Sequence, residues 1–183
     1  MKKYQIIFLF ILLFLNHATA TETLIDSLKK GKKIVFIRHA LAPGNGDPQN
    51  FDIKDCLTQR NLNQIGINQS KKIGLIFKKN KIEIGKVLSS EWCRCKDTAK
   101  LAFKNYETFD ALNSFYDVRF MNNKDKQIKD LRNYINNWKS NKNLILVTHY
   151  VVILEILNKS TLPGEIIVSD KGFNIIGNFN VSN

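Results

Sequence analysis

Short apolar runs alternate along the chain with segments whose apolar residues recur at helical spacing. The two clearest runs are Ile34–Ile37 and Leu144–Val147, and each consists of four large apolar residues. Such runs are typical of strands that are buried on both faces, as in a parallel sheet. Weaker runs predict further strands over 86–89, 109–115, 165–169 and 174–179, the last two joined by a turn at 170–172.

Helical spacing predicts helices that cover this sheet. In the segment 61–79 the apolar residues fall on one face and lysines surround the outer face, and shorter stripes mark the segments 22–30, 92–103, 128–138 and 151–157. Ser90 is a ready N-cap for the helix over 92–103. The alternation predicts an α/β fold, a three-layer sandwich with a central, mainly parallel sheet covered by helices on both faces.

One long segment, residues 41–60, has no periodicity and contains four turn-forming residues, Pro43, Gly44, Gly46 and Pro48. It therefore predicts a loop that begins where the first buried strand ends. A loop of this length beside a strand end is more often functional than idle. We expect it to border a site.

The first 20 residues have the pattern of a secretory signal. Lys2 and Lys3 precede an apolar run over Ile6–Leu15, and Ala18-Thr19-Ala20 is a small-x-small cleavage site. The apolar run is too short for a comfortable membrane span, and nothing comparable follows it. We expect a signal peptide over 1–20 and, after its cleavage, an exported domain over 21–183 that is periplasmic or secreted and has no membrane span. The alternative is a signal anchor that is not cleaved.

The formal net charge is +12, and it falls to +10 when Lys2 and Lys3 are removed with the signal. A basic surface suits anionic partners, including phosphorylated small molecules, acidic glycolipid head groups and nucleic acid. Most of the charge, however, is lysine spread among asparagine and isoleucine, a pattern of solvated helix faces. Aromatic and basic residues are not interleaved as in single-strand binders, so nucleic acid is not an expected partner.

Cys56, Cys93 and Cys95 are the cysteines of the chain. Export favours a disulfide, and because cysteines separated by one residue bridge poorly, the pair joins Cys56 to Cys93 or to Cys95. Cys56–Cys93 is the candidate that we carry forward. As metal ligands, Cys93 and Cys95 have the wrong spacing for a zinc knuckle and lack a second ligand pair. We expect neither a metal nor another cofactor.

Charged and titratable residues follow the two buried runs directly. Arg38 and His39 come after the first run and His149 after the second, and these are the two histidines that remain once His17 leaves with the signal. The carboxyl ends of parallel strands meet at one edge of a sheet, where ligands bind in α/β folds. Arg94 falls in the first turn of the helix over 92–103, where free backbone N–H groups favour an anion.

These four side chains have a coherent chemistry if they converge. Two guanidinium groups can clamp a phosphoryl group, one imidazole can attack phosphorus in line, and the other, protonated, can stabilise the equatorial oxygens. Fixed cations would then neutralise charge as magnesium does elsewhere. The alternative is a purely structural role, in which each histidine simply follows the end of a buried strand. The sequence favours phosphoryl transfer without a metal.

Three blocks of sequence resemble the histidine phosphatase superfamily, also called the phosphoglycerate mutase-like fold. They are Arg38-His39-Ala40, the stretch Ser89–Arg94 with Asp97-Thr98-Ala99 behind it, and Val147-Thr148-His149. Leu57-Thr58, with Gly66 and Gln69, is similar to a fourth block. The resemblance covers most of 33–157 and is to the small single-domain bacterial members. It implies His39 as the nucleophile that becomes phosphohistidine, and Arg38, Arg94 and His149 as the phosphate pocket.

The chain departs from the family pattern at the proton donor for the leaving group. Tyr150 follows His149 where an acid can stand, and 112–120 contains no glutamate, which leaves Asp117 as the nearest candidate acid. The resemblance thus implies an exported, metal-independent phosphatase that acts on a phosphorylated small molecule or an envelope glycolipid. Two other classes stay open: a non-catalytic phosphate- or glycolipid-binding module on the same fold, and a redox protein that uses Cys93 and Cys95.

Overall fold

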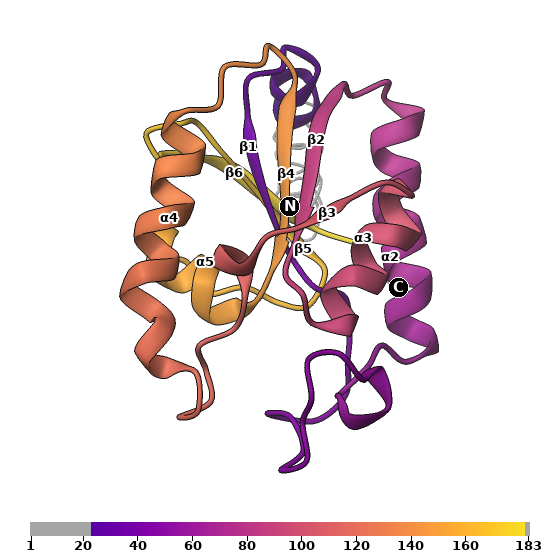
Figure 1. Ribbon diagram of the computed structural model, residues 1–183. Helices are drawn as coiled ribbons and strands as arrows, with labels where there is room; N and C mark the ends of the chain where they lie inside the picture. The colour runs from indigo at the N-terminus through magenta and orange to yellow at the C-terminus, as the bar shows by residue number, and fades with distance from the viewer. Residues whose placement is uncertain (1–22, 182–183) are drawn as a thin grey trace, which may run out of the picture.

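A computed structural model of the protein describes residues 23–181, so the predicted signal segment 1–20 lies outside the described residues. Within this part of the chain, six strands form one sheet in the order β3-β2-β4-β1-β5-β6 (Figure 1). The strands are β1 (Ile34–Arg38), β2 (Ile84–Ser89), β3 (Glu107–Thr108), β4 (Asn143–Thr148), β5 (Glu165–Ser169) and β6 (Ile175–Asn180).

The sheet is mainly parallel. The strands β3, β2, β4 and β1 run parallel to one another, whereas β5 is antiparallel to β1 and β6 is antiparallel to β5. Arg38 is in register with Thr148, so β1 and β4 end at the same level. The residues that follow them, His39 and His149, therefore leave the sheet side by side.

Helices cover both faces of the sheet, as the sequence predicts. Figure 1 shows α2 (Gln64–Lys79) and α3 (Cys93–Phe103) on one face and α4 (Lys124–Asn136) and α5 (Tyr150–Leu157) on the other. Alternate residues of β1 serve the two layers: Val35 and Ile37 pack toward α2 and α3, while Ile34 and Phe36 pack toward α4 and α5. A further helix over 23–29 adds Leu24 and Leu28 to the first layer. The three-layer prediction is confirmed.

The prediction of a strand over 109–115 is wrong. The chain forms the two-residue strand β3 just before it and then a 3-10 helix over Asp110–Leu112. Phe109, Leu112 and Phe115 are three residues apart, which matches the period of a 3-10 turn better than that of a strand. Leu112 and Ala111 are buried by this turn, and the Leu112 carbonyl accepts a hydrogen bond from Thr148 Oγ1 at 2.6 Å.

Two local predictions about helix starts also need correction. Ser90 does not cap α3, because this helix begins at Cys93 and its N-cap position, Trp92, makes no side-chain cap. Asn63 caps α2 by accepting a hydrogen bond from Gly66 N at 2.9 Å, so the helix begins three residues later than the periodicity indicated. No helix within residues 23–181 is long and apolar enough to cross a membrane.

Candidate functional site

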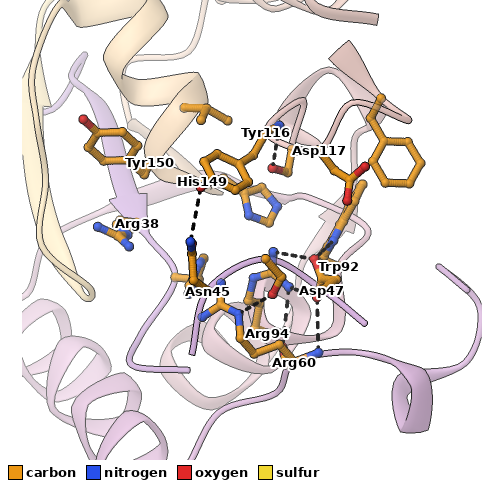
Figure 2. A pocket seen from close by; sticks show the side chains of 15 residues that line it. Arg38, Asn45, Asp47, Arg60, Trp92, Arg94, Tyr116, Asp117, His149 and Tyr150 are labelled. Carbon is orange, nitrogen blue, oxygen red and sulfur yellow. Dashed lines mark hydrogen bonds and ion pairs between the residues drawn. The ribbon is translucent and has the colours of Figure 1, made fainter. Parts of the chain in front are cut away.

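A pocket lies at the carboxyl ends of β1, β2 and β4, and residues of the loop 41–60 form part of its lining. It is lined by all five of the residues that the sequence singled out, Arg38, His39, Arg94, Asp117 and His149. The fold brings Arg38, His39 and His149 together because β1 and β4 end at this edge of the sheet. Arg94 joins them because α3 begins at the same edge, after β2. Figure 2 labels four of them, Arg38, Arg94, Asp117 and His149, among the side chains that line the pocket.

His39 is buried, and its backbone N–H continues the ladder by donating to Thr148 O at 2.9 Å. Its ring Nδ1 lies 2.8 Å from Ala40 O. A carbonyl oxygen can only accept, so Nδ1 carries the proton and Nε2 carries the lone pair. Burial, together with the charge of Arg94, lowers the pKa of His39 well below its ordinary value. The residue is therefore a neutral imidazole with Nε2 free to act as a nucleophile.

His149 lies against His39, with ring centroids 5.5 Å apart, and is equally buried. Its Nε2 is 2.8 Å from Ser90 Oγ and 3.4 Å from Cys95 Sγ. Its ring and the Trp92 ring are in a T-shaped arrangement, with the two ring centroids 5.3 Å apart. Burial, with the charges of Arg94 and His39, lowers the pKa of His149 well below its ordinary value. In the free protein both site histidines are consequently neutral near pH 7.

Arg38 and Arg94 each have a guanidinium nitrogen without a hydrogen-bond partner. Arg38 Nη1 donates to Thr161 O at 2.5 Å, and its guanidinium lies over the Tyr150 ring at 5.4 Å. Its Nε is buried without a hydrogen-bond partner, and so is Arg94 Nε. Among residues 23–181 these two are the buried side-chain nitrogens without a partner. Both arginines line the pocket, and two guanidinium groups at one pocket favour an anion there.

Asp47 is a site residue that the sequence analysis missed. Figure 2 shows its carboxylate between Trp92 and Arg94. Arg94 Nη1 and Nη2 donate to its two oxygens at 2.8 and 3.1 Å, and Trp92 Nε1 donates to Oδ2 at 3.0 Å. Burial would raise the pKa of Asp47, but hydrogen bonds from Arg94 and the Arg94 charge outweigh it, so the pKa is lowered. Asp47 is an anion that fixes one edge of the Arg94 guanidinium.

Arg60 is the second missed residue, and it makes the pocket a three-arginine site. Its backbone N–H donates to Asp47 Oδ1 at 3.2 Å, its Nε donates to Gly46 O at 2.9 Å, and its Nη1 donates to Ala42 O. Arg60 thus holds the loop in a closed shape. The one available signal was the loop itself, which the sequence places beside the strand end without showing which of its residues turn inward.

Asp117, the candidate acid, lines the pocket but is paired elsewhere. Its Oδ2 lies 2.8 Å from Arg119 Nη2, and hydrogen bonds from Arg119 lower the pKa of Asp117 to about 2. A carboxyl with that pKa carries no proton near neutral pH. The acid role stays a prediction, and the ion pair with Arg119 works against it.

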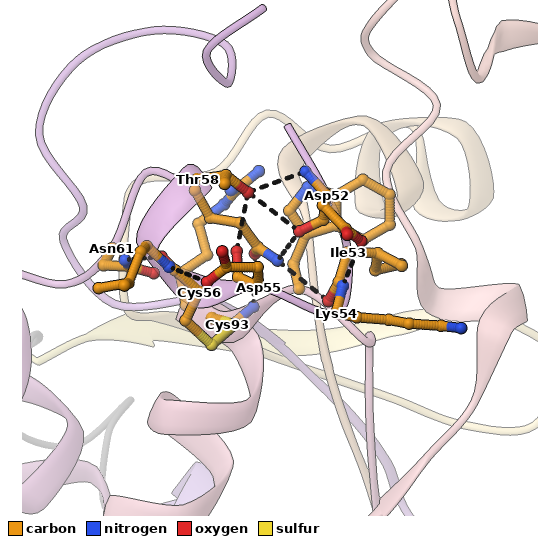
Figure 3. The surroundings of a disulfide bond; sticks show 12 residues. Asp52, Ile53, Lys54, Asp55, Cys56, Thr58, Asn61 and Cys93 are labelled. Atoms are coloured by element: carbon orange, nitrogen blue, oxygen red, sulfur yellow. Dashed lines mark hydrogen bonds between the residues drawn. A yellow bond between two sulfur atoms is a disulfide. The ribbon is translucent and has the colours of Figure 1, made fainter. Parts of the chain in front are cut away.

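A disulfide joins Cys56 to Cys93, one of the two pairings that the sequence predicts (Figure 3). It ties the end of the loop 41–60 to the first residue of α3, directly before Arg94. Gln59 strengthens the same junction, because its Oε1 accepts a hydrogen bond from Cys93 N at 2.9 Å. Cys95 is free and buried, and burial raises the pKa of its thiol to about 12. Cys93 is thus partnered by Cys56, and the structure gives no support to a redox pair with Cys95.

Within residues 23–181, no group of histidine, cysteine, aspartate and glutamate side chains is arranged to hold a metal ion.

No family model matches the chain, and no curated protein matches it in sequence. Solved structures do match. The protein histidine phosphatase SixA, complexed with tungstate, is 17% identical with a TM-score of 0.56, covering 81% of this chain and 96% of that one.

Two further structures extend this likeness. Phosphoglycerate mutase from Thermus thermophilus is 15% identical with a TM-score of 0.57, covering 82% of this chain and 99% of that one. The mycobacterial glucosyl-3-phosphoglycerate phosphatase is 13% identical with a TM-score of 0.55, covering 75% and 92% of the two chains. At these identities the likeness concerns the fold. The chain therefore has the α/β fold that phosphoglycerate mutase shares with histidine phosphatases.

Proposed function

We propose that the protein is an exported, metal-independent phosphatase that hydrolyses a phosphate monoester or another phosphoryl compound through a phosphohistidine on His39. The observation that carries the proposal is one pocket that Arg38, Arg60 and Arg94 line together with His39, whose Nδ1 donates to Ala40 O. Arginine guanidinium groups bind phosphoryl oxygens, and a phosphoryl group held in this pocket would lie beside His39.

In the first step the lone pair of His39 Nε2 attacks phosphorus, the Nε2–P bond forms, and the bond from phosphorus to the leaving oxygen breaks. Arg38 and Arg94 hold the non-bridging oxygens, and their positive charge stabilises the negative charge that gathers there. Because Asp47 fixes one edge of the Arg94 guanidinium, this cation is positioned before substrate arrives. In the second step water attacks phosphorus, inorganic phosphate leaves, and neutral His39 is restored.

The leaving group determines how much the reaction needs an acid. An alkoxide must be protonated as it leaves, whereas the leaving groups of phosphohistidine, acyl phosphate or pyrophosphate bonds are better able to depart unprotonated. The one candidate acid, Asp117, is paired with Arg119. The proposed substrates are therefore phosphorylated small molecules or envelope glycolipid head groups whose phosphoryl bond has a good leaving group. Export rests on the pattern of residues 1–20.

A non-catalytic phosphate- or glycolipid-binding module is the second candidate. The observation that favours it is the ion pair of Asp117 with Arg119, since a pocket lined by arginines and without a protonated acid can bind phosphate without turning over an alkyl ester. The two candidates differ in whether His39 becomes phosphorylated.

The decisive experiment uses the full-length chain, expressed so that any export occurs, with the recovered species sequenced at its N-terminus. Hydrolysis of p-nitrophenyl phosphate is measured with a chelator present, beside the His39→Ala variant. We expect turnover that the chelator leaves unchanged and that His39→Ala abolishes, and after a rapid quench we expect a phosphoryl group on the protein that is stable to base and labile to acid. Full activity in His39→Ala would refute the mechanism, and phosphate binding without turnover would establish the binding module.

A further inference from the structure

Ser90 is a buried serine whose hydroxyl the proposed mechanism does not use. It follows β2, and its Oγ lies 2.8 Å from His149 Nε2. We propose that Ser90, oriented by Asn113, is a positioning residue that accepts a hydrogen bond from protonated Nε2 of His149, so that this histidine presents Nδ1 to the phosphoryl group. The hydrogen bonds determine this orientation, and its consequence for phosphate rests on the proposed function.

The Asn113 side chain fixes the first link. The backbone N–H of Glu91 donates to Asn113 Oδ1 at 2.9 Å, so that atom must be the amide oxygen. The amide nitrogen then donates to Glu91 Oε2 at 2.6 Å. Both halves of the amide are satisfied only in this orientation, which presents an acceptor, Oδ1, to the serine.

Besides the Cys95 thiol, which is only a weak acceptor, the Ser90 hydroxyl has three polar neighbours, and it has one hydrogen. Trp92 N lies 3.3 Å away and can only donate, while Asn113 Oδ1 lies 3.1 Å away and can only accept. The hydroxyl hydrogen therefore goes to Asn113. Toward His149 Nε2 the Ser90 oxygen can only accept, so Nε2 must carry a proton for all three contacts to be hydrogen bonds.

Cys95 does not compete for this proton. Its Sγ is 3.4 Å from the same nitrogen, but sulfur is a weak acceptor, and the thiol can donate to Thr148 O at 3.7 Å. The buried thiol stays neutral, since burial raises its pKa to about 12. The Ser90 oxygen is thus the stronger acceptor beside Nε2.

The arrangement matters when an anion enters. The charged groups that act on His149 are the guanidinium groups of Arg94, Arg60 and Arg38, with His39 beside it, and together with burial they keep it neutral in the free protein. A phosphate dianion reverses this preference, and Nδ1 takes up a proton and donates to a phosphate oxygen. The resulting imidazolium needs an acceptor at each nitrogen. Phosphate supplies one and Ser90 Oγ supplies the other, so Ser90 favours the cation that binds phosphate.

The test compares Ser90→Ala with Ser89→Ala, in the full-length protein as recovered after expression. Ser89 is a matched control, because it is equally buried and its hydroxyl donates to Ser90 O at 2.8 Å without contacting His149. Nitrogen-15 NMR of the free protein should show His149 protonated at Nε2 in the wild type and in Ser89→Ala. In Ser90→Ala this tautomer should lose its preference, and in Asn113→Ala the freed hydroxyl should donate to Nε2 and favour protonation at Nδ1.

Binding of inorganic phosphate provides the second readout. At neutral pH, Ser90→Ala should weaken phosphate binding by about tenfold, as expected for a lost hydrogen bond to a charged group, and should move the alkaline limb of binding about one pH unit lower. Ser89→Ala should leave that limb in place. Wild-type His149 protonated at Nδ1, or identical pH profiles for the two serine variants, would overturn the proposal. The NMR readout needs no turnover, so failure of the phosphatase proposal appears separately, as activity that survives His39→Ala.

Discussion

Removal of the Cys56–Cys93 disulfide should destabilise the protein by about 4 kcal/mol. The two cysteines are 37 residues apart along the chain, and a link across a loop of that length lowers the entropy of the unfolded chain by a corresponding amount. For a domain of this size, each kcal/mol shifts the melting temperature by about 2–4 °C. The double variant Cys56→Ala/Cys93→Ala should therefore melt about 8–16 °C below the wild type.

The assay is equilibrium unfolding in urea, with Cys95→Ala as the control for loss of a buried sulfur without loss of a cross-link. The double variant should have a lower midpoint and a steeper dependence on urea, because its unfolded chain is more expanded. The variant should also bind phosphate more weakly, since the disulfide anchors the loop that carries Asp47 and Arg60. A midpoint within the equivalent of about 1 kcal/mol of the wild type would refute the loop-entropy reasoning.

Three further predictions concern the titratable groups of the pocket. Asp47→Asn should lower the free energy of unfolding by about 2 kcal/mol at pH 7. Because folding lowers the pKa of Asp47, the difference in stability from the wild type should shrink as the pH falls below 3.8 and through the pKa of the folded state. Urea unfolding midpoints measured as a function of pH test this. Folding lowers the pKa values of His39 and His149, so as the pH falls the unfolded chain takes up protons before the folded chain does. The free energy of unfolding should therefore decrease below pH 6.5, by up to about 2.7 kcal/mol per pH unit. A free energy of unfolding that stays constant between pH 6.5 and 5 would contradict the burial of the two histidines as neutral rings. If Asp117 is the acid, Asp117→Asn should slow hydrolysis of an alkyl phosphate by about 100-fold and spare p-nitrophenyl phosphate, whereas equal rates for wild type and variant would remove it from the mechanism.

The sequence was most informative where burial is continuous. The runs that became β1 and β4 are apolar at every position because both faces of the sheet are covered, and this fixes where Arg38, His39 and His149 leave the sheet. Arg94 could be placed for a similar reason, since a helix start after a parallel strand lies at the same edge.

The loop 41–60 shows what could not be predicted. Its residues have no period, so their sequence does not say which side chains turn toward the pocket. Asp47 is placed by donors on Trp92 and Arg94, which lie more than forty residues away along the chain, and by the backbone of Arg60. The position of an irregular loop follows from such tertiary contacts, and a single sequence does not display them.

The ion pair between Asp47 and Arg94 also sets the charge of the pocket. Three arginines line it, Asp47 cancels one of them, and Asp117 is cancelled by Arg119, which leaves +2 while both histidines are neutral. A phosphate monoester dianion carries the opposite charge of the same size, so it compensates the charge of the free pocket, before His149 takes up its proton. A phosphodiester, with a single negative charge, leaves one cation buried without compensation. The pocket should therefore select terminal phosphoryl groups over bridging ones, by charge rather than by shape.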